Sequence, residues 1–135
     1  MRAFLTGLLV ASLVAAPAAQ AASITLACSG NVTAPGEPEK TTVDDLSIIV
    51  DLDKSTVVSE KIWDRPIPFI AIDANEVKFG ADINYGSSSV SLYGTIDRIT
   101  GKTDIGTDRT FRLKNGNAVM TENWDLRCKP SKSLF

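Results

Sequence analysis

Residues 118–128 read Ala118-Val-Met-Thr-Glu-Asn-Trp-Asp-Leu-Arg-Cys128, and this stretch decides the fold. Every second position except Glu122 belongs to one apolar set: Ala118, Met120, Trp124, Leu126 and Cys128. Side chains of a β-strand point alternately to its two faces, so an apolar set with a period of two residues predicts a strand with one buried face. The cysteine shares the phase of the apolar residues, as a buried disulfide requires.

A matching strand is expected near the other end of the chain. Ile24, Leu26, Cys28 and Val32 share one phase there, so this cysteine too lies on the apolar side. The chain has two cysteines, which allow a single pairing, Cys28 with Cys128, in an oxidising compartment. We therefore expect a disulfide that brings the first and last strands together.

The chain between these strands has the pattern of an all-β protein. Turn residues recur roughly every 8–12 positions, and the helical period is almost absent. Eight strands are expected, near residues 24–33, 44–52, 56–63, 67–73, 76–83, 88–98, 102–112 and 117–128. Consecutive hairpins form a meander, and a meander whose ends meet is a single antiparallel up-and-down β-barrel of about eight strands. A β-sandwich is the alternative.

Three glycines have predicted structural roles. Asn115-Gly116 predicts a type I′ hairpin turn, because both central residues of that turn need a positive φ. Gly101 fits a turn position with positive φ. Gly94 falls within a strand on its inward phase, where a barrel needs a kink or room for a large neighbour.

Residues 1–21 predict a secretory signal peptide. Arg2 supplies the positive start, and the apolar run from Phe4 to Val14 is shorter than the roughly 20 residues of a membrane-spanning helix. Ala19-Gln-Ala21 offers small residues for cleavage. We therefore expect residues 22–135 to form a single all-β domain. We expect this domain to be periplasmic or secreted.

The distribution of charge argues against several partners. The chain has 14 Lys and Arg and 16 Asp and Glu, and losing Arg2 with the signal leaves 13 against 16, a net charge of −3. The charges are interspersed, which argues against nucleic acid or anionic lipid as the main partner. No second apolar stretch is long enough to span a membrane, so we expect no membrane insertion after signal removal. We also expect the protein to be a monomer.

The composition also removes most catalytic chemistry. There is no histidine, the commonest general base and metal ligand. With both cysteines in a disulfide, thiol catalysis and a cysteine zinc site are excluded as well. An enzyme of this composition would have to work with carboxylates alone, as glycoside hydrolases do. We therefore predict a non-enzymatic protein without catalytic residues, metal or cofactor.

Glu122 and Trp124 are candidate contacts for a ligand or partner. Glu122 shares the inward phase of Trp124, and a carboxylate inside a barrel needs a partner, which Arg98 or Arg112 can supply. The alternatives are that a bulge shifts the phase or that Glu122 lies at the barrel mouth.

Trp63 and Arg65 are the other two candidates. They begin a stiff segment that contains Pro66 and Pro68, and Trp and Arg are enriched in binding hot spots. The alternative is that Trp63 lies on the rim of the core.

Several segments resemble a group of small exported proteins of rhizobia-like alphaproteobacteria. They are Gly94-Thr-Ile-Asp-Arg-Ile-Thr-Gly101, Cys28-Ser-Gly30, Cys128-Lys-Pro130 and the final Phe135. The resemblance covers the two ends and one hairpin, and it implies a Gram-negative periplasm or secretion. It implies no function.

Taken together, the residues favour a non-catalytic binding module for a small ligand or an envelope protein. The alternative is a structural or protein-interaction component of the cell envelope, such as an inhibitor-like barrel. A cavity inside the barrel would favour ligand binding, whereas a barrel filled by its own side chains would favour the alternative.

Overall fold

A computed structural model describes residues 23–131 apart from Pro35 and Pro38. The predicted signal peptide and Phe135 lie outside the described residues. The strands are β1 (Ser23–Thr33), β2 (Thr41–Asp51), β3 (Thr56–Val58), β4 (Ile67–Ile72), β5 (Glu76–Asn84), β6 (Ser88–Asp97), β7 (Lys102–Leu113) and β8 (Gly116–Pro130). In this part of the chain no helix is long and apolar enough to cross a membrane.

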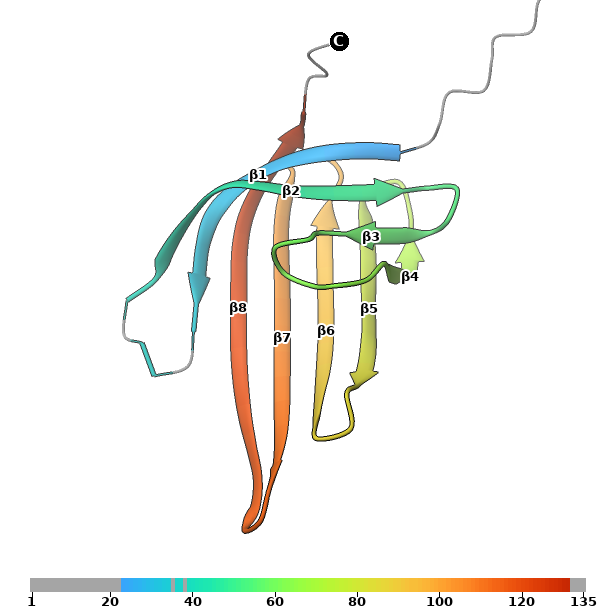
Figure 1. The fold of residues 1–135 in the computed structure, drawn as a ribbon. Coiled ribbons are helices and arrows are strands. Elements are labelled where there is room, and N and C mark those ends of the chain that lie inside the picture. The colour runs from blue at the N-terminus through green and yellow to red at the C-terminus, as the bar shows by residue number, and fades with distance from the viewer. Residues whose placement is uncertain (1–22, 35, 38, 132–135) are drawn as a thin grey trace, which may run out of the picture.

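The eight strands form one closed barrel. Each strand pairs with the next in antiparallel orientation, and β1 also pairs with β8, which closes the ring (Figure 1). The predicted up-and-down barrel is therefore confirmed, and the sandwich alternative is wrong. Sequential hairpins place each strand beside the next, and pairing of the first strand with the last closes the sheet into a barrel. The closed part of such a barrel has no unpaired strand edge.

The strands differ greatly in length, and this shapes the molecule. β3 has 3 residues, whereas β7 has 12 and β8 has 15. β5 to β8 continue past the short β3 and β4, so their far halves form a wall that the other strands do not cover (Figure 1). The barrel is therefore open on one side at that end.

The third strand is shorter than predicted, since it ends at Val58 instead of residue 63. The backbone N–H groups of Ile62 and Trp63 both donate to the carbonyl of Ser59, at 3.1 and 3.0 Å, and this turn replaces the strand ladder. The turn carries Trp63 into the core. The limits of the other strands agree with the prediction to within three residues.

The hairpin between β7 and β8 turns one residue earlier than predicted. Leu113 pairs with Gly116, so Lys114 and Asn115 are the two turn residues. Gly116 has a positive φ of 127°, and Asn115 does not have one, so the type I′ turn is wrong. Gly101 has the predicted positive φ, 78°.

The core fills the closed part of the barrel with residues on the inner phases of the strands. Phe79 is fully buried in it and lies beneath Gly94 of β6. A Cβ atom on Gly94 would overlap Cζ of the Phe79 ring. The expectation of room for a large neighbour is thus confirmed, and the neighbour is Phe79.

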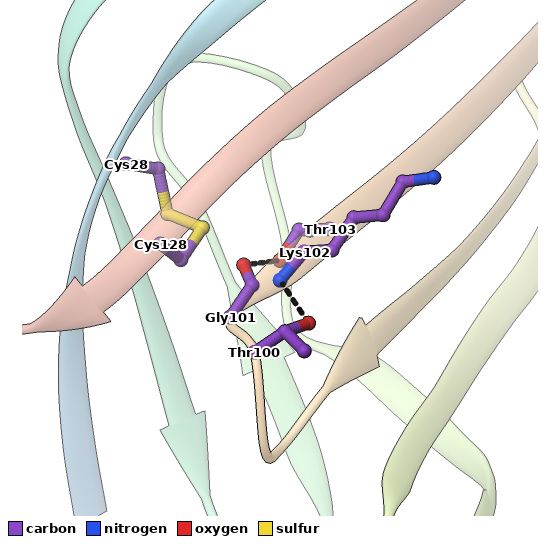
Figure 2. Close-up of a disulfide and its surroundings, with 6 residues drawn as sticks. All are labelled: Cys28, Thr100, Gly101, Lys102, Thr103 and Cys128. Carbon is purple, nitrogen blue, oxygen red and sulfur yellow. Dashed lines mark hydrogen bonds between the residues drawn. A yellow bond between two sulfur atoms is a disulfide. The ribbon is translucent and has the colours of Figure 1, made fainter.

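The disulfide closes the seam between the first and last strands. Cys28 and Cys128 are directly opposite each other in the β1–β8 ladder, with their Cα atoms 4.1 Å apart. The N–H of Cys128 donates to the carbonyl of Gly101 at 2.8 Å. The Thr103 hydroxyl donates to the same carbonyl at 3.3 Å, as Figure 2 shows beside the disulfide. The seam is therefore tied to the β6–β7 turn as well.

Candidate functional site

A cavity of about 540 Å³ lies between the β3–β4 connection and the inner face of the β5–β8 wall. We call it the mouth cavity. Its apolar lining includes three buried side chains, Ile83, Val90 and Leu92. Most of its charged lining is exposed: Glu60, Lys61, Asp64 and Arg109, with Glu122 half-buried. The cavity thus combines a dry apolar side with a charged opening.

The change in character follows from where the barrel is closed. On the inner phase of β7, Thr103 and Ile105 are buried, but Thr107 and Arg109 further along are not. The second pair lies beyond the reach of the short strands, so water reaches it. On β7 and β8 the charged inner positions, Arg109 and Glu122, therefore lie where the barrel opens.

Glu122 faces the mouth cavity from β8, where it pairs across with Thr107 and is half-buried. The predicted partners are wrong. Arg98 donates to the Asp73 carbonyl and lines a different cavity, beside Cys128, while Arg112 lies on the outer phase of β7.

Arg109 is the inner-phase cation next to Glu122. It sits on β7 one inner position beyond Thr107 and pairs across with Met120. Among the described residues, neither Arg109 nor Glu122 makes an ion pair within 4.0 Å. Two opposite charges therefore line one cavity and remain available to a bound molecule.

Trp124 lies deeper on the same strand and is half-buried. Its indole Nε1–H is buried and has no hydrogen-bond acceptor among the described residues. Leaving a buried donor unpaired costs about 1–3 kcal/mol. The Trp124 ring borders the cavity, whereas its N–H is enclosed by protein and is not exposed to the cavity.

Trp63 is a core residue with one side on the mouth cavity. It is only 7% exposed, its Nε1–H donates to the Val57 carbonyl at 3.2 Å, and its ring centre is 5.7 Å from that of Phe79. The rim-of-core alternative describes it well. Its large ring closes the inner side of the cavity instead of projecting towards a partner.

Arg65 belongs to a surface cluster that fastens the β3–β4 connection to the end of β5. Its Nε lies 3.2 Å from Asp64 Oδ1, and its guanidinium carbon lies 5.3 Å from the centre of the Tyr85 ring. The Tyr85 hydroxyl donates to both Asp64 oxygens, at 3.1 and 3.2 Å. The hydrogen bonds from Arg65 and then Tyr85 lower the pKa of Asp64. We call these three residues the latch.

Sequence reasoning missed Asp64, Tyr85 and Arg109 as lining residues. Asp64 and Tyr85 are 21 residues apart and meet only because the connection folds across the barrel. Arg109 could have been predicted from the sequence, because it is a charged residue on the inward phase of a strand, as Glu122 is.

A second depression, of about 450 Å³, runs over the outer face of the sheet. It passes over Gly106, where no side chain fills the outer phase, beside Tyr93 and Asn123. Tyr93 donates from its hydroxyl to Asp82 at 3.1 Å and is held on the surface by it. Of the four predicted contacts only Trp124 borders this groove, so the mouth cavity is the stronger candidate.

Comparisons of the chain with protein-family models, curated proteins and solved structures find no match. The resemblance to exported proteins of rhizobia-like alphaproteobacteria therefore stays a prediction. The fold and the site define the class directly: a disulfide-closed, eight-stranded antiparallel β-barrel with a cavity at its open end.

Proposed function

We propose that this protein is an exported, non-catalytic binding module that holds a small amphipathic molecule in the mouth cavity. One observation carries the proposal. Glu122 and Trp124, chosen for their shared inward phase, and Trp63, chosen for a separate reason, line the same cavity, whose apolar side is buried and whose charged side is open.

The size and chemistry of the cavity support a small ligand. Its volume of about 540 Å³ lies within the range of roughly 300–1,000 Å³ that small-molecule sites occupy. The buried lining around Leu92 suits an apolar body. Arg109 and Glu122 suit a polar or charged head.

The latch supports a non-catalytic role. A glycosidase-type mechanism needs one carboxylic acid whose pKa is raised, so that it can donate a proton at neutral pH. Asp64 lines the cavity, but hydrogen bonds from Arg65 and Tyr85 lower its pKa and keep it ionised. We therefore propose that this carboxylate positions the connection and takes no part in proton transfer.

The disulfide supports export. A cross-strand bridge between the ends of the chain persists in an oxidising compartment. Together with the predicted signal peptide, this leads us to propose that the protein works in the periplasm or outside the cell, as a monomer.

The alternative is a protein-interaction component of the envelope. The exposed latch favours it, because Arg65 and Tyr85 form a fixed polar and aromatic surface beside the cavity. The two functions use different surfaces. A protein partner would contact the exposed latch from outside, whereas a small ligand would occupy the mouth cavity, which must then be free of protein side chains.

Filling the cavity tests the proposal. Thr107→Phe adds a ring on the inner face, and Ser89→Phe adds the same ring to an exposed position on the outer phase of β6. The protein, purified from a periplasm, is titrated with the fluorescent amphipathic probe 1-anilinonaphthalene-8-sulfonate, and its extract is searched for co-purified small molecules by mass spectrometry. We expect Thr107→Phe to abolish both signals and Ser89→Phe to keep them.

Glu122→Gln provides a second test that does not depend on a bulky residue being tolerated. It keeps the size of the side chain and removes its negative charge, so we expect the affinity for the anionic probe to rise while the melting temperature does not change. If wild type binds no probe and carries no small molecule, or if Thr107→Phe folds and binds as wild type does, the mouth cavity is not the site and the interaction role takes its place.

A further inference from the structure

The far end of the β7–β8 hairpin stands clear of the rest of the protein. The last pair between β6 and β7 is Ser88 with Phe111, and β1 stops pairing with β8 at Asn123. Beyond these points the Arg112 N–H still donates to the Ser87 carbonyl at 3.1 Å, and the two strands otherwise pair with each other (Figure 1). We call residues 112–119 the hairpin tip.

The tip exposes apolar side chains on both of its faces. Leu113 and Val119 are each 60% exposed. Leu113 lies on the inner phase and Val119 lies on the outer phase. A partner that docks on one flat face of the hairpin would cover one set only. A medium that surrounds the tip, as the interface of a bilayer does, covers both.

The tip is also cationic in an otherwise acidic chain. Residues 112–119 contain two cations, Arg112 and Lys114, and no Asp or Glu. The remainder of the chain has the other 12 of the 14 Lys and Arg against all 16 Asp and Glu. Leu113 separates the two cations in sequence, so they form no basic run. The hairpin carries both on one protruding element.

We propose that the hairpin tip docks into the headgroup region of an anionic phospholipid bilayer. Leu113 and Val119 enter the interface, and Arg112 and Lys114 meet the lipid phosphates. The docking is peripheral, because the strands stay paired within the barrel. A hairpin with a two-residue turn is already ordered, so little conformational entropy is lost on docking.

Vesicle co-sedimentation tests this surface independently of the mouth cavity. The protein purified from a periplasm is mixed with vesicles of equal parts phosphatidylglycerol and phosphatidylcholine, or of phosphatidylcholine alone. We expect binding to the anionic vesicles that weakens with added salt. Arg112→Gln combined with Lys114→Gln should lower it about 25-fold, from about fivefold for each cation near the surface. Leu113→Ser combined with Val119→Ser should lower it as well.

Two control variants lie at the opposite end of the barrel. Ile99→Ser removes an apolar residue that is 75% exposed in the β6–β7 turn, and Lys102→Gln removes an exposed cation beside it. Both should bind vesicles as wild type does. Glu122→Gln should also leave vesicle binding unchanged, which separates this proposal from ligand binding.

Three results would overturn the proposal: no binding to anionic vesicles, equal binding by the tip variants, or equal loss in the control variants. Sedimentation equilibrium without lipid can give a fourth result that would overturn it. A dimer that Leu113→Ser dissociates would assign the tip to contact between two copies of the chain.

Discussion

Single aspartates organise several of the turns at the scale of the residue. Asp97 Oδ1 accepts the backbone N–H groups of Ile99 and Thr100, at 2.8 and 2.9 Å. Asp73 Oδ1 accepts those of Asn75 and Glu76 in the same way, at 2.7 and 2.9 Å. Each carboxylate therefore satisfies two donors that the strand ladders leave free. These hydrogen bonds have their full strength only when the carboxylate is ionised. The stability of each turn therefore depends on pH.

The Asp97 turn should lose its stabilisation in acid. The hydrogen bonds from Thr100 and then Ile99 lower the pKa of Asp97 below its ordinary value of 3.8. A lowered folded-state pKa gives stability that is fully present above 3.8 and is lost as pH falls through the folded pKa. We expect Asp97→Ala to melt at a lower temperature than wild type at neutral pH, and this difference to shrink below pH 3.8.

Thermal unfolding followed by circular dichroism from about pH 7 to about pH 2 measures that difference. Asp53→Ala is the control, because Asp53 is an exposed turn carboxylate with no hydrogen bond found among the described residues. A gap between wild type and Asp97→Ala that stays constant over this range would contradict the prediction.

At the scale of the element, β6 and β7 each carry a glycine with a different surrounding. Gly94 of β6 is on the inner phase above Phe79, whereas Gly106 of β7 is on the outer phase. The nearest atom to the place that a Cβ of residue 106 would take is Asn123 Oδ1, at 3.7 Å. Both glycines adopt ordinary strand backbone, so the space around them decides what a methyl group does. The pair therefore separates packing from backbone conformation.

Gly94→Ala should destabilise the barrel, and Gly106→Ala should not. The new methyl group of Gly94→Ala overlaps the fully buried Phe79 ring, and overpacking of this kind costs about 1–3 kcal/mol. A methyl group at Gly106 meets only an ordinary contact and should change the free energy of unfolding by less than about 0.5 kcal/mol. Urea unfolding gives both values, and equal values for the two variants would show that Phe79 moves aside.

The elements also show what the sequence could predict and what it could not. Alternation marks a strand wherever one face is buried, so seven of the eight predicted strands end within three residues of the observed limits. β3 is the exception, because its end depends on Trp63 reaching Phe79, a contact between distant residues. The inward phase of Glu122 was readable for the same reason as the strands, whereas the latch between Asp64 and Tyr85 was not.

At the scale of the whole molecule, the β1–β8 seam turns a meander into a barrel. It pairs residues 26–33 with residues 123–130, which lie at opposite ends of the described chain. Closing so long a loop costs entropy that the hydrogen bonds of the seam must offset. Cys28 and Cys128, 100 residues apart in sequence, hold this loop closed in the unfolded chain too. The disulfide therefore acts on the closure of the entire fold.

Removing the bridge should lower the free energy of unfolding and leave the barrel intact. In the chain-entropy model a loop of about 100 residues corresponds to about 4–5 kcal/mol. We expect Cys28→Ala combined with Cys128→Ala to lose an amount of this order in guanidinium unfolding and to keep the circular dichroism of the wild type. The mouth cavity should still bind its probe, because neither Cys28 nor Cys128 lines it.

Wild type reduced with dithiothreitol is the matched control and should unfold at a similarly reduced midpoint. An unchanged free energy in both samples would mean that the hydrogen bonds of the seam close the barrel without the disulfide, and loss of probe binding would show that closure at the seam also shapes the mouth.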